Sequence, residues 1–285
     1  MVGCECCSAL YHRRDATAQG NGQNLEIMIV IKSPAEIDRM RVACAAAAEI
    51  LAAVAHSVEP GCTTAELDDV AAQMIAKLGG KSPFLGYRGY PGHLCVSVNE
   101  EVVHGIPSQR RVQYGDIVSL DVGIVLDGFV GDNATTVPVG VVESRAQHLL
   151  RVTEQALYAG IAAARAGHRV GDISHAVQTT VESAGFSVVR EFVGHGVGRN
   201  MHEEPQIPNY GRAGEGPKLK PGMTLAIEPM INAGTSDVVM LSDGWTVVSA
   251  DGAPSAHFEH TVLITDGDAE FLTWLKKSPY ESKAR

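Results

Sequence analysis

Two strand-like stretches decide the fold: Gly115-Asp116-Ile117-Val118-Ser119-Leu120-Asp121 and Gly222-Met223-Thr224-Leu225-Ala226-Ile227-Glu228. They lie 107 positions apart, and each starts with glycine, continues with mostly apolar residues and ends in a carboxylate. An acid inside an apolar strand is costly unless it has a partner, so packing alone does not explain its occurrence twice. The repetition therefore predicts two related halves whose acidic side chains serve one site.

The segments that precede these strands repeat as well. Each half is expected to contain two helices followed by strands, with helices at residues 34–56, 64–78, 143–166 and 172–185. The first helix carries a capping box, in which Ser33 is the N-cap and Glu36 reaches back to its backbone. The order of helix, helix and strands in both halves predicts one α+β fold with a pseudo-twofold axis.

A hairpin is expected next to the first acidic strand. Residues 117–126 and 129–139 are rich in β-forming residues and are joined by Asp127-Gly128, a strong two-residue turn signal. That turn pairs position 123 with position 132, which places Asp121 and Asp132 on one face as diagonal neighbours, about 7–8 Å apart at the backbone. The two side chains are predicted to be a metal-ligand pair; the alternative is an exposed strand with solvated acids.

The second half supplies Glu228 and Glu259, which each interrupt an apolar strand, and His195, which lies between two glycines. Two like charges 4 Å apart repel by about 4 kcal/mol at an effective dielectric constant near 20. Two divalent cations would neutralise four clustered carboxylates. Carboxylate oxygens with one imidazole and no thiolate suit Mn, Fe(II), Co or catalytic Zn.

Six motifs in this order closely resemble the type I methionine aminopeptidases: Asn99-Glu100-Glu101-Val102-Val103-His104-Gly105-Ile106-Pro107, Asp121 with Asp132, Gly194-His195-Gly196-Val197-Gly198, His202-Glu203-Glu204-Pro205, Ile227-Glu228-Pro229 and Phe258-Glu259-His260-Thr261. Each motif is weak alone, but their order and spacing cover residues 28–273. The resemblance implies the pseudo-twofold pita-bread fold, in which a curved antiparallel sheet surrounds the metal site and helices lie outside.

The resemblance also implies how the ligands are shared between two ions. Asp121 would bind one ion, His195 and Glu228 would bind the other, and Asp132 and Glu259 would bridge both. The ions would lower the pKa of an attacking water and polarise the scissile carbonyl.

Three residues are implied to act in catalysis. Glu228 would relay a proton, His202 would hydrogen-bond the scissile carbonyl or its oxyanion, and His104 would contact the substrate near its N-terminal residue.

The resemblance further implies a pocket for a methionine side chain, formed by Tyr87, Tyr90, Cys95 and Trp245. A thioether fits such an apolar slot lined by aromatic rings. Two positions depart from the family: Phe84 stands where many relatives have cysteine, and Met201 where they often have phenylalanine. Both substitutions are expected to alter the shape of the pocket and access for the second residue.

The expected substrate is the N-terminal methionine of nascent polypeptides, with a preference for a small second residue. The family also implies action near the ribosome and a monovalent cation near Asn99 and Ser255. A net charge of −10 with no long basic run argues against specific nucleic-acid binding. The absence of a membrane-length apolar run and of a disulfide framework predicts a cytoplasmic protein, expected to be a monomer.

Residues 1–27 are polar and rich in Gly, Asn and Gln, so they are expected to form a flexible extension, upstream of an alternative start at Met28. Cys4, Cys6 and Cys7 are too poorly separated to predict a zinc module there. Residues 28–285 are expected to form a single catalytic domain.

Two alternatives remain. An Xaa-Pro aminopeptidase or dipeptidase on the same fold would share all five ligands, but such enzymes usually have a larger N-terminal domain, and only about 30 residues precede the first helix here. A non-catalytic binding protein on this scaffold would typically have ligands replaced, whereas this sequence retains all five.

Overall fold

A curved antiparallel sheet forms the centre of the fold in the computed structural model, which describes residues 29–274. Its main path runs β1-β3-β4-β13-β8-β6-β7, and β14 pairs with β13. The strands are β1 (Leu94–Val98), β3 (Ile117–Leu126), β4 (Phe129–Pro138), β13 (Glu259–Leu263), β8 (Thr224–Ile227), β6 (Gly194–Gly196), β7 (Glu203–Ile207) and β14 (Glu270–Phe271). The extension expected at residues 1–27 lies outside the described residues.

The strand order contains the predicted repeat. β4 pairs with β13 at the centre, β3 and β8 flank this pair, and β1 and β6 come next on either side. The strands that carry Asp121 and precede Glu228, β3 and β8, therefore occupy equivalent places in the two halves. The predicted α+β, pseudo-twofold architecture is confirmed.

The predicted hairpin between β3 and β4 is confirmed in its register as well. Gly123 pairs with Asp132, and the turn residues Asp127 and Gly128 have φ angles of 49° and 77°. Two consecutive positive φ angles are those of a type I′ turn, whose twist matches that of the flanking strands.

Two three-stranded sheets complete the β-structure. One contains β10 (Val238–Met240), β11 (Val247–Ser249) and β2 (Glu101–Val103), and the other contains β12 (Ser255–His257), β9 (Met230–Asn232) and β5 (Ser187–Val188). The first sheet matters for the site, because His104 directly follows β2 and Trp245 lies two residues before β11.

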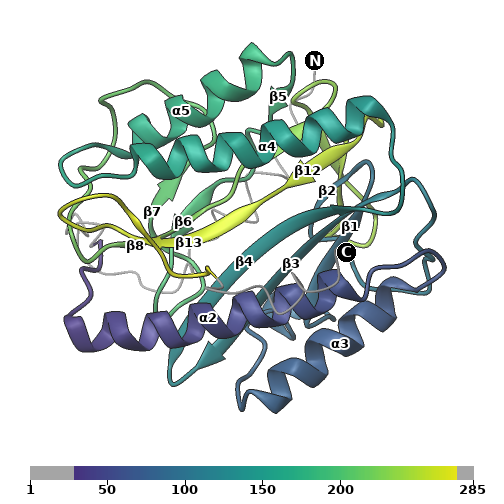
Figure 1. The fold of residues 1–285 in the computed structure, drawn as a ribbon, viewed down its shortest axis with the longest axis horizontal. Coiled ribbons are helices and arrows are strands. Elements are labelled where there is room, and N and C mark those ends of the chain that lie inside the picture. Colours follow the sequence, from purple (N-terminus) through teal and green to yellow (C-terminus); the bar gives the residue numbers. More distant parts are fainter. Residues whose placement is uncertain (1–28, 275–285) are drawn as a thin grey trace, which may run out of the picture.

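Four long helices lie outside the strands, with α2 and α3 on one side in Figure 1 and α4 and α5 on the other. They are α2 (Pro34–His56), α3 (Thr64–Lys77), α4 (Ser144–Ala163) and α5 (Val170–Ser183). All four were predicted, but α5 begins two residues earlier than expected. Asp172 is not its first residue; its carboxylate accepts a hydrogen bond from the backbone N–H of Arg169, which is the N-cap.

The alanine-rich sequence of α2 has a packing reason. The helix lies so close to β4 that a Cβ atom at Gly131 would collide with the carbonyl group of Ala43. Ala43 and Ala47 are fully buried in this contact region of the core. Small side chains on the helix and glycine on the strand allow the backbones to approach, which fixes the strand that carries Asp132.

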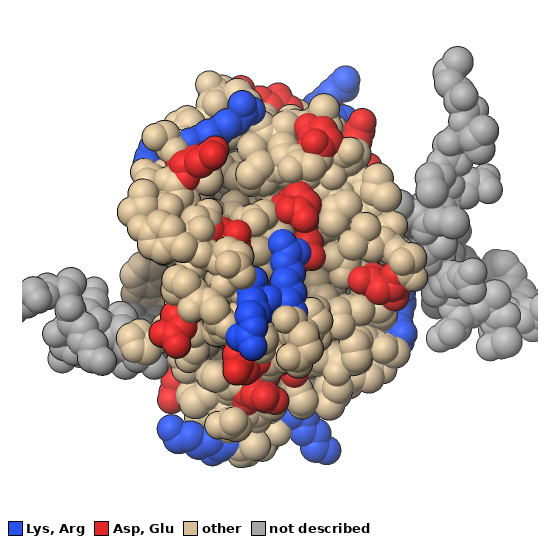
Figure 2. Space-filling model, turned by 90° about the vertical axis from the view of Figure 1, so that its right-hand side faces the viewer, with Lys and Arg blue, Asp and Glu red and all other residues tan. Residues whose placement is uncertain are grey.

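On the face shown in Figure 2, Lys and Arg side chains lie among Asp and Glu side chains, so neither charge dominates this face. Within residues 29–274, none of the helices has the length and apolar character needed to cross a membrane.

Candidate active site

The strand register brings the predicted acidic residues of both halves onto one row. Ala134 of β4 pairs with Asp121 of β3 on one side and with Glu259 of β13 on the other. Asp132 is two residues from Ala134 on the same strand, so its side chain lies on the same face. The small side chain of Ala134 leaves space between the carboxylates.

The second half contributes the remaining two residues to this face. The pairing of β13 with β8 reaches Ile227 opposite His260, so the next residue, Glu228, comes beside Glu259. His195 of β6 pairs with Ala226, two residues before Glu228, and therefore shares its face. All five predicted ligands are thus brought together from four strands and a strand end.

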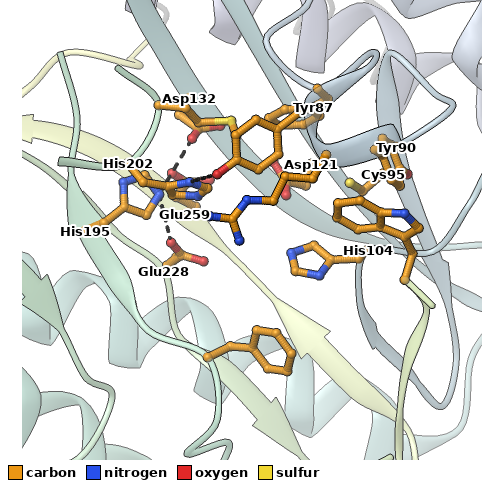
Figure 3. A pocket seen from close by; sticks show the side chains of 15 residues that line it. Tyr87, Tyr90, Cys95, His104, Asp121, Asp132, His195, His202, Glu228 and Glu259 are labelled. Atoms are coloured by element: carbon orange, nitrogen blue, oxygen red, sulfur yellow. Dashed lines mark hydrogen bonds and ion pairs between the residues drawn. The ribbon is translucent and has the colours of Figure 1, made fainter. Parts of the chain in front are cut away.

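The side-chain oxygen and nitrogen atoms of these residues lie close enough together to bind metal ions (Figure 3). Carboxylate oxygens of Asp121, Asp132 and Glu259 lie within 4.8 Å of one another. The Nε2 atom of His195 lies 3.4 Å from Glu228 Oε1 and 3.8 Å from Asp132 Oδ2.

The tautomer of His195 follows from its second nitrogen. Nδ1 lies 2.8 Å from the carbonyl oxygen of Gly196, which can only accept a hydrogen bond. Nδ1 therefore carries the proton, and the lone pair of Nε2 faces the carboxylates. This arrangement is typical of a histidine that binds a metal through Nε2.

The carboxylates fit divalent cations on chemical grounds. Asp132 and Glu259 are buried, and Asp132 Oδ1 and Glu259 Oε1 have no hydrogen-bond partner among the described residues. Burial raises the pKa of Asp132 to about 7, and burial followed by neighbouring carboxylates raises the pKa of Glu259 well above its usual range. Buried acids that keep one oxygen without a hydrogen-bond partner are stabilised by a bound cation or by protons.

Protons and metal ions compete for these carboxylates. We therefore expect low pH to stabilise the metal-free fold and high pH to favour stabilisation by bound metal. The raised pKa values mean that the metal-free folded chain binds more protons than the unfolded chain, whose Asp and Glu titrate at about 3.9 and 4.3. The resulting stability is fully present below about pH 4 and is lost as pH rises through about 7. We expect the increase in melting temperature caused by added Mn²⁺ to be larger at pH 8 than at pH 6. An increase that is larger at pH 6 would contradict the cation assignment.

An apolar cavity of about 180 Å³ opens beside the carboxylates. All the predicted pocket residues line it: Phe84, Tyr87, Tyr90, Cys95, Met201 and Trp245. The hydroxyl group of Tyr90 is held by the backbone carbonyls of Leu94 and Gly105 at 3.1 and 2.9 Å. Its ring is thereby fixed edge-on to Trp245, with ring centroids 5.0 Å apart.

Two predicted histidines stand at this cavity in neutral form. His202 lies with its ring centroid 4.5 Å from that of His195, and its Nδ1 is 3.2 Å from the hydroxyl oxygen of Tyr87. Burial, followed by the charges of nearby histidines and Arg88, lowers the pKa of His202 to about 2. Burial lowers the pKa of His104 to about 4, and its ring packs edge-on against Phe192 and Trp245.

Three residues at the site were not predicted from the sequence: Arg88, Phe192 and His257. His257 is buried, and its Nε2 lies 3.5 Å from Glu228 Oε2. It precedes Glu259 by two residues, so the two-residue periodicity of strands would have identified it. Arg88 and Phe192 line the cavity, but neither lies in a sequence pattern that distinguishes it from surface or core.

The segments of Asn99 and Ser255 also meet. The backbone N–H of Ser255 donates to the carbonyl oxygen of Asn99 at 2.8 Å. The side chains have other partners: Asn99 Oδ1 accepts from the backbone N–H of Ile117, and Ser255 Oγ donates to the carbonyl oxygen of Ile231. A monovalent cation there stays a prediction.

The fold and the acidic cluster define a metallopeptidase. The sequence model of metallopeptidase family M24 matches residues 38–266, and the chain belongs to this family. The chain is 51% identical over 246 residues to methionine aminopeptidase 1 of Bacillus subtilis, which covers 86% of this chain and 99% of that protein. It is 44% identical over 249 residues to methionine aminopeptidase 1 of Mycobacterium tuberculosis, covering 85% of this chain and 94% of that protein.

Solved structures agree with the predicted pita-bread fold. A methionine aminopeptidase from Thermotoga maritima superposes with a TM-score of 0.86 and 51% identity, covering 87% of this chain and all of that one. A prolidase from Pyrococcus furiosus superposes with a TM-score of 0.70 at 22% identity, covering 87% of this chain and 66% of that one. The second similarity shows the shared fold alone.

Proposed function

We propose that this chain removes methionine from the N-termini of peptides and nascent proteins by metal-dependent hydrolysis. The observation that carries the proposal is the apolar, aromatic cavity directly beside five clustered side chains that suit two divalent ions. Methionine aminopeptidases at 44 and 51% identity over most of the chain support it.

Asp121 would hold one ion, His195 and Glu228 the other, and Asp132 and Glu259 would lie between them. Mn, Fe(II), Co and Zn all suit this donor set. When bound, the ions would polarise the scissile carbonyl group and lower the pKa of the attacking water.

The remaining chemistry falls to side chains of the chain itself. Glu228 would accept and return a proton, as the resemblance to the family implies; its two carboxylate oxygens lie 3.4 and 3.5 Å from Nε2 of His195 and of His257. His202 donates a hydrogen bond to the scissile carbonyl oxygen. If the hydroxyl group of Tyr87 donates to Nδ1 of His202, the proton of His202 resides on Nε2, which can then donate to the substrate.

The substrate's methionine side chain would enter between Tyr90, Cys95 and Trp245. Tyr90 cannot rotate away, since its hydroxyl group is bound to two backbone carbonyls. His104 would contact the N-terminal residue from the side of Trp245, to which its ring is packed at 6.1 Å. The residue after methionine would be small because Met201 and His202 limit the space beyond the scissile bond.

The choice of substrate can be tested against the proline-directed alternative. Met-Ala-Ser and an Xaa-Pro dipeptide series should be assayed with the same metal-loaded protein. We expect cleavage of Met-Ala-Ser with release of free methionine, and at least about 100-fold lower kcat/KM for Xaa-Pro substrates, the discrimination that a shaped pocket can supply. Preference for Xaa-Pro substrates would refute the methionine proposal.

The wider setting is proposed from the family. Residues 28–285 would act as one catalytic domain and as a monomer in the cytoplasm, on chains that emerge from the ribosome. A monovalent cation would bind near Asn99 and Ser255, whose backbones are joined.

A further inference from the structure

Trp245 lines the apolar cavity, yet it does not belong to a regular strand. It lies in the turn between β10 and β11, two residues before β11 begins. Its ring meets the ring of Tyr90 edge-on at 5.0 Å and the ring of His104 at 6.1 Å, measured between centroids. Tyr90 is buried, whereas Trp245 is half-buried and follows four exposed residues, 241–244. The position of this wall of the cavity therefore depends on what holds the turn.

The carboxylate of Asp243 ties the turn to Trp245. Its Oδ1 atom accepts hydrogen bonds from the backbone N–H groups of Trp245 and Thr246, at 2.8 and 2.9 Å. Its Oδ2 atom accepts from the hydroxyl group of Thr246 at 2.7 Å. Hydrogen bonds to an ionised acceptor are stronger than those between neutral groups. Thr246 is buried, so the carboxylate links the backbone of Trp245 to a fixed point at the start of β11.

Backbone hydrogen bonds close the turn around this carboxylate. The N–H of Leu241 donates to the carbonyl oxygen of Thr246 at 2.8 Å, and the N–H of Gly244 donates to that of Leu241 at 3.1 Å. Gly244 has a φ of 77°, a left-handed conformation that glycine adopts readily. These two bonds do not include Trp245, whose own N–H is bound by Asp243. The side chain of Asp243 therefore adds a restraint on Trp245 to those that close the turn.

We propose that Asp243 is a positioning residue for the methionine pocket: its carboxylate holds the ring of Trp245 at the distance from Tyr90 that fits a thioether side chain. The inference rests on the proposed removal of methionine and assigns part of the binding of methionine to a residue outside the cavity lining. A pocket that is already formed binds its ligand without the cost of ordering its walls. Loss of the carboxylate adds that cost, so it weakens binding of the methionine side chain.

The first test separates KM from kcat, with the metal-loaded full chain and Met-Ala-Ser as substrate. In Asp243→Ala we expect KM to rise about tenfold, the change expected when one hydrogen bond to a charged group is lost. We expect kcat to change by less than about twofold, because the methionine side chain is bound alike before and during the reaction. Asp243→Asn should keep KM within about twofold of the wild type, since an amide oxygen can still accept from both backbone N–H groups.

The matched control is Asp251→Ala. Asp251 is exposed, precedes a glycine of positive φ as Asp243 does, and accepts hydrogen bonds from the backbone N–H groups of Thr235 and Ala253. It is not among the residues that line the cavity. Asp251→Ala should therefore leave KM unchanged. An equal rise of KM in this control would overturn the inference, because it would show general loosening of the turns.

A second test does not depend on catalysis. The chain has two tryptophans, Trp245 and Trp274, so Trp274→Phe leaves Trp245 as the only one. In this background, acrylamide should quench the fluorescence of Trp245 more strongly in Asp243→Ala, and no more strongly in Asp243→Asn or Asp251→Ala. Unchanged KM or unchanged quenching in Asp243→Ala would overturn the inference. Failure of the wild type to cleave Met-Ala-Ser would instead refute the proposed function, and quenching would still show whether Asp243 holds Trp245.

Discussion

Asp132→Asn is expected to abolish detectable removal of methionine. Losing a residue that only supports a metal ligand costs about 10- to 100-fold in activity, and loss of a ligand should lower kcat/KM by well over that amount. The carboxylate lies within 4.8 Å of those of Asp121 and Glu259, and its Oδ1 has no hydrogen-bond partner among the described residues. Asparagine keeps the shape of the side chain but removes the charge that two neighbouring cations would share. Steady-state assays with Met-Ala-Ser and metal analysis of the purified variant would measure both effects.

His195→Ala should have the same consequence, because it removes the imidazole whose Nε2 lies 3.4 Å from Glu228 Oε1 and 3.8 Å from Asp132 Oδ2. A suitable control is Asp268→Asn, since the side chain of Asp268 is 80% exposed and does not line the cavity. Undiminished turnover in both Asp132→Asn and His195→Ala would refute the assignment of the metal ligands.

Lys32→Met is expected to lower the free energy of unfolding by about 3–5 kcal/mol, the usual cost of leaving one partner of a buried ion pair alone. The ammonium group of Lys32 lies 2.7 Å from Glu203 Oε2, and the two side chains are only 3% and 8% exposed. The backbone N–H of Lys32 also donates to the carbonyl oxygen of Gly222. Because Glu203 directly follows His202, we expect kcat to fall as well. Urea denaturation monitored by circular dichroism would measure the loss.

A double variant isolates the ion pair from other effects of Lys32. Lys32→Met combined with Glu203→Gln should recover much of the lost stability, since no unpaired charge is left buried. Arg41→Met serves as the exposed control, because Arg41 is 44% exposed and its ion pairs should contribute at most about 1 kcal/mol. A loss below about 1 kcal/mol in Lys32→Met would show that the pair is not desolvated in solution.

The central hairpin and the acidic row were predictable because they follow local rules. Asp127-Gly128 determines the turn, the turn determines that Gly123 faces Asp132, and a strand's two-residue period then orients Asp121. The same rule extends to His257, which was overlooked two residues before Glu259. The start of α5 could not be predicted to the residue, because its N-cap, Arg169, is not one of the residue types that usually cap helices.

Contacts between distant segments were not predictable in the same way. The pair of Lys32 and Glu203 joins residues 171 positions apart, and nothing in either local sequence indicates the partner. Phe192 follows Arg190 and Glu191, and nothing in this local sequence indicates that His104 packs against its ring. Trp245 in turn packs against His104. The sequence around Arg88 has the composition of a surface turn. Arg88 lies at the cavity because Phe84 and Tyr90, on either side of this turn, are buried.

The most direct test of the account is hydrolysis of Met-Ala-Ser by the same protein sample before chelation, after chelation, and after readdition of Mn²⁺, Fe²⁺, Co²⁺ or Zn²⁺, with metal content measured at each step. We predict that methionine release is lost on chelation, returns with at least one of these ions, and requires the side chains of Asp132 and His195. Full activity of chelated protein that contains no metal would contradict the account.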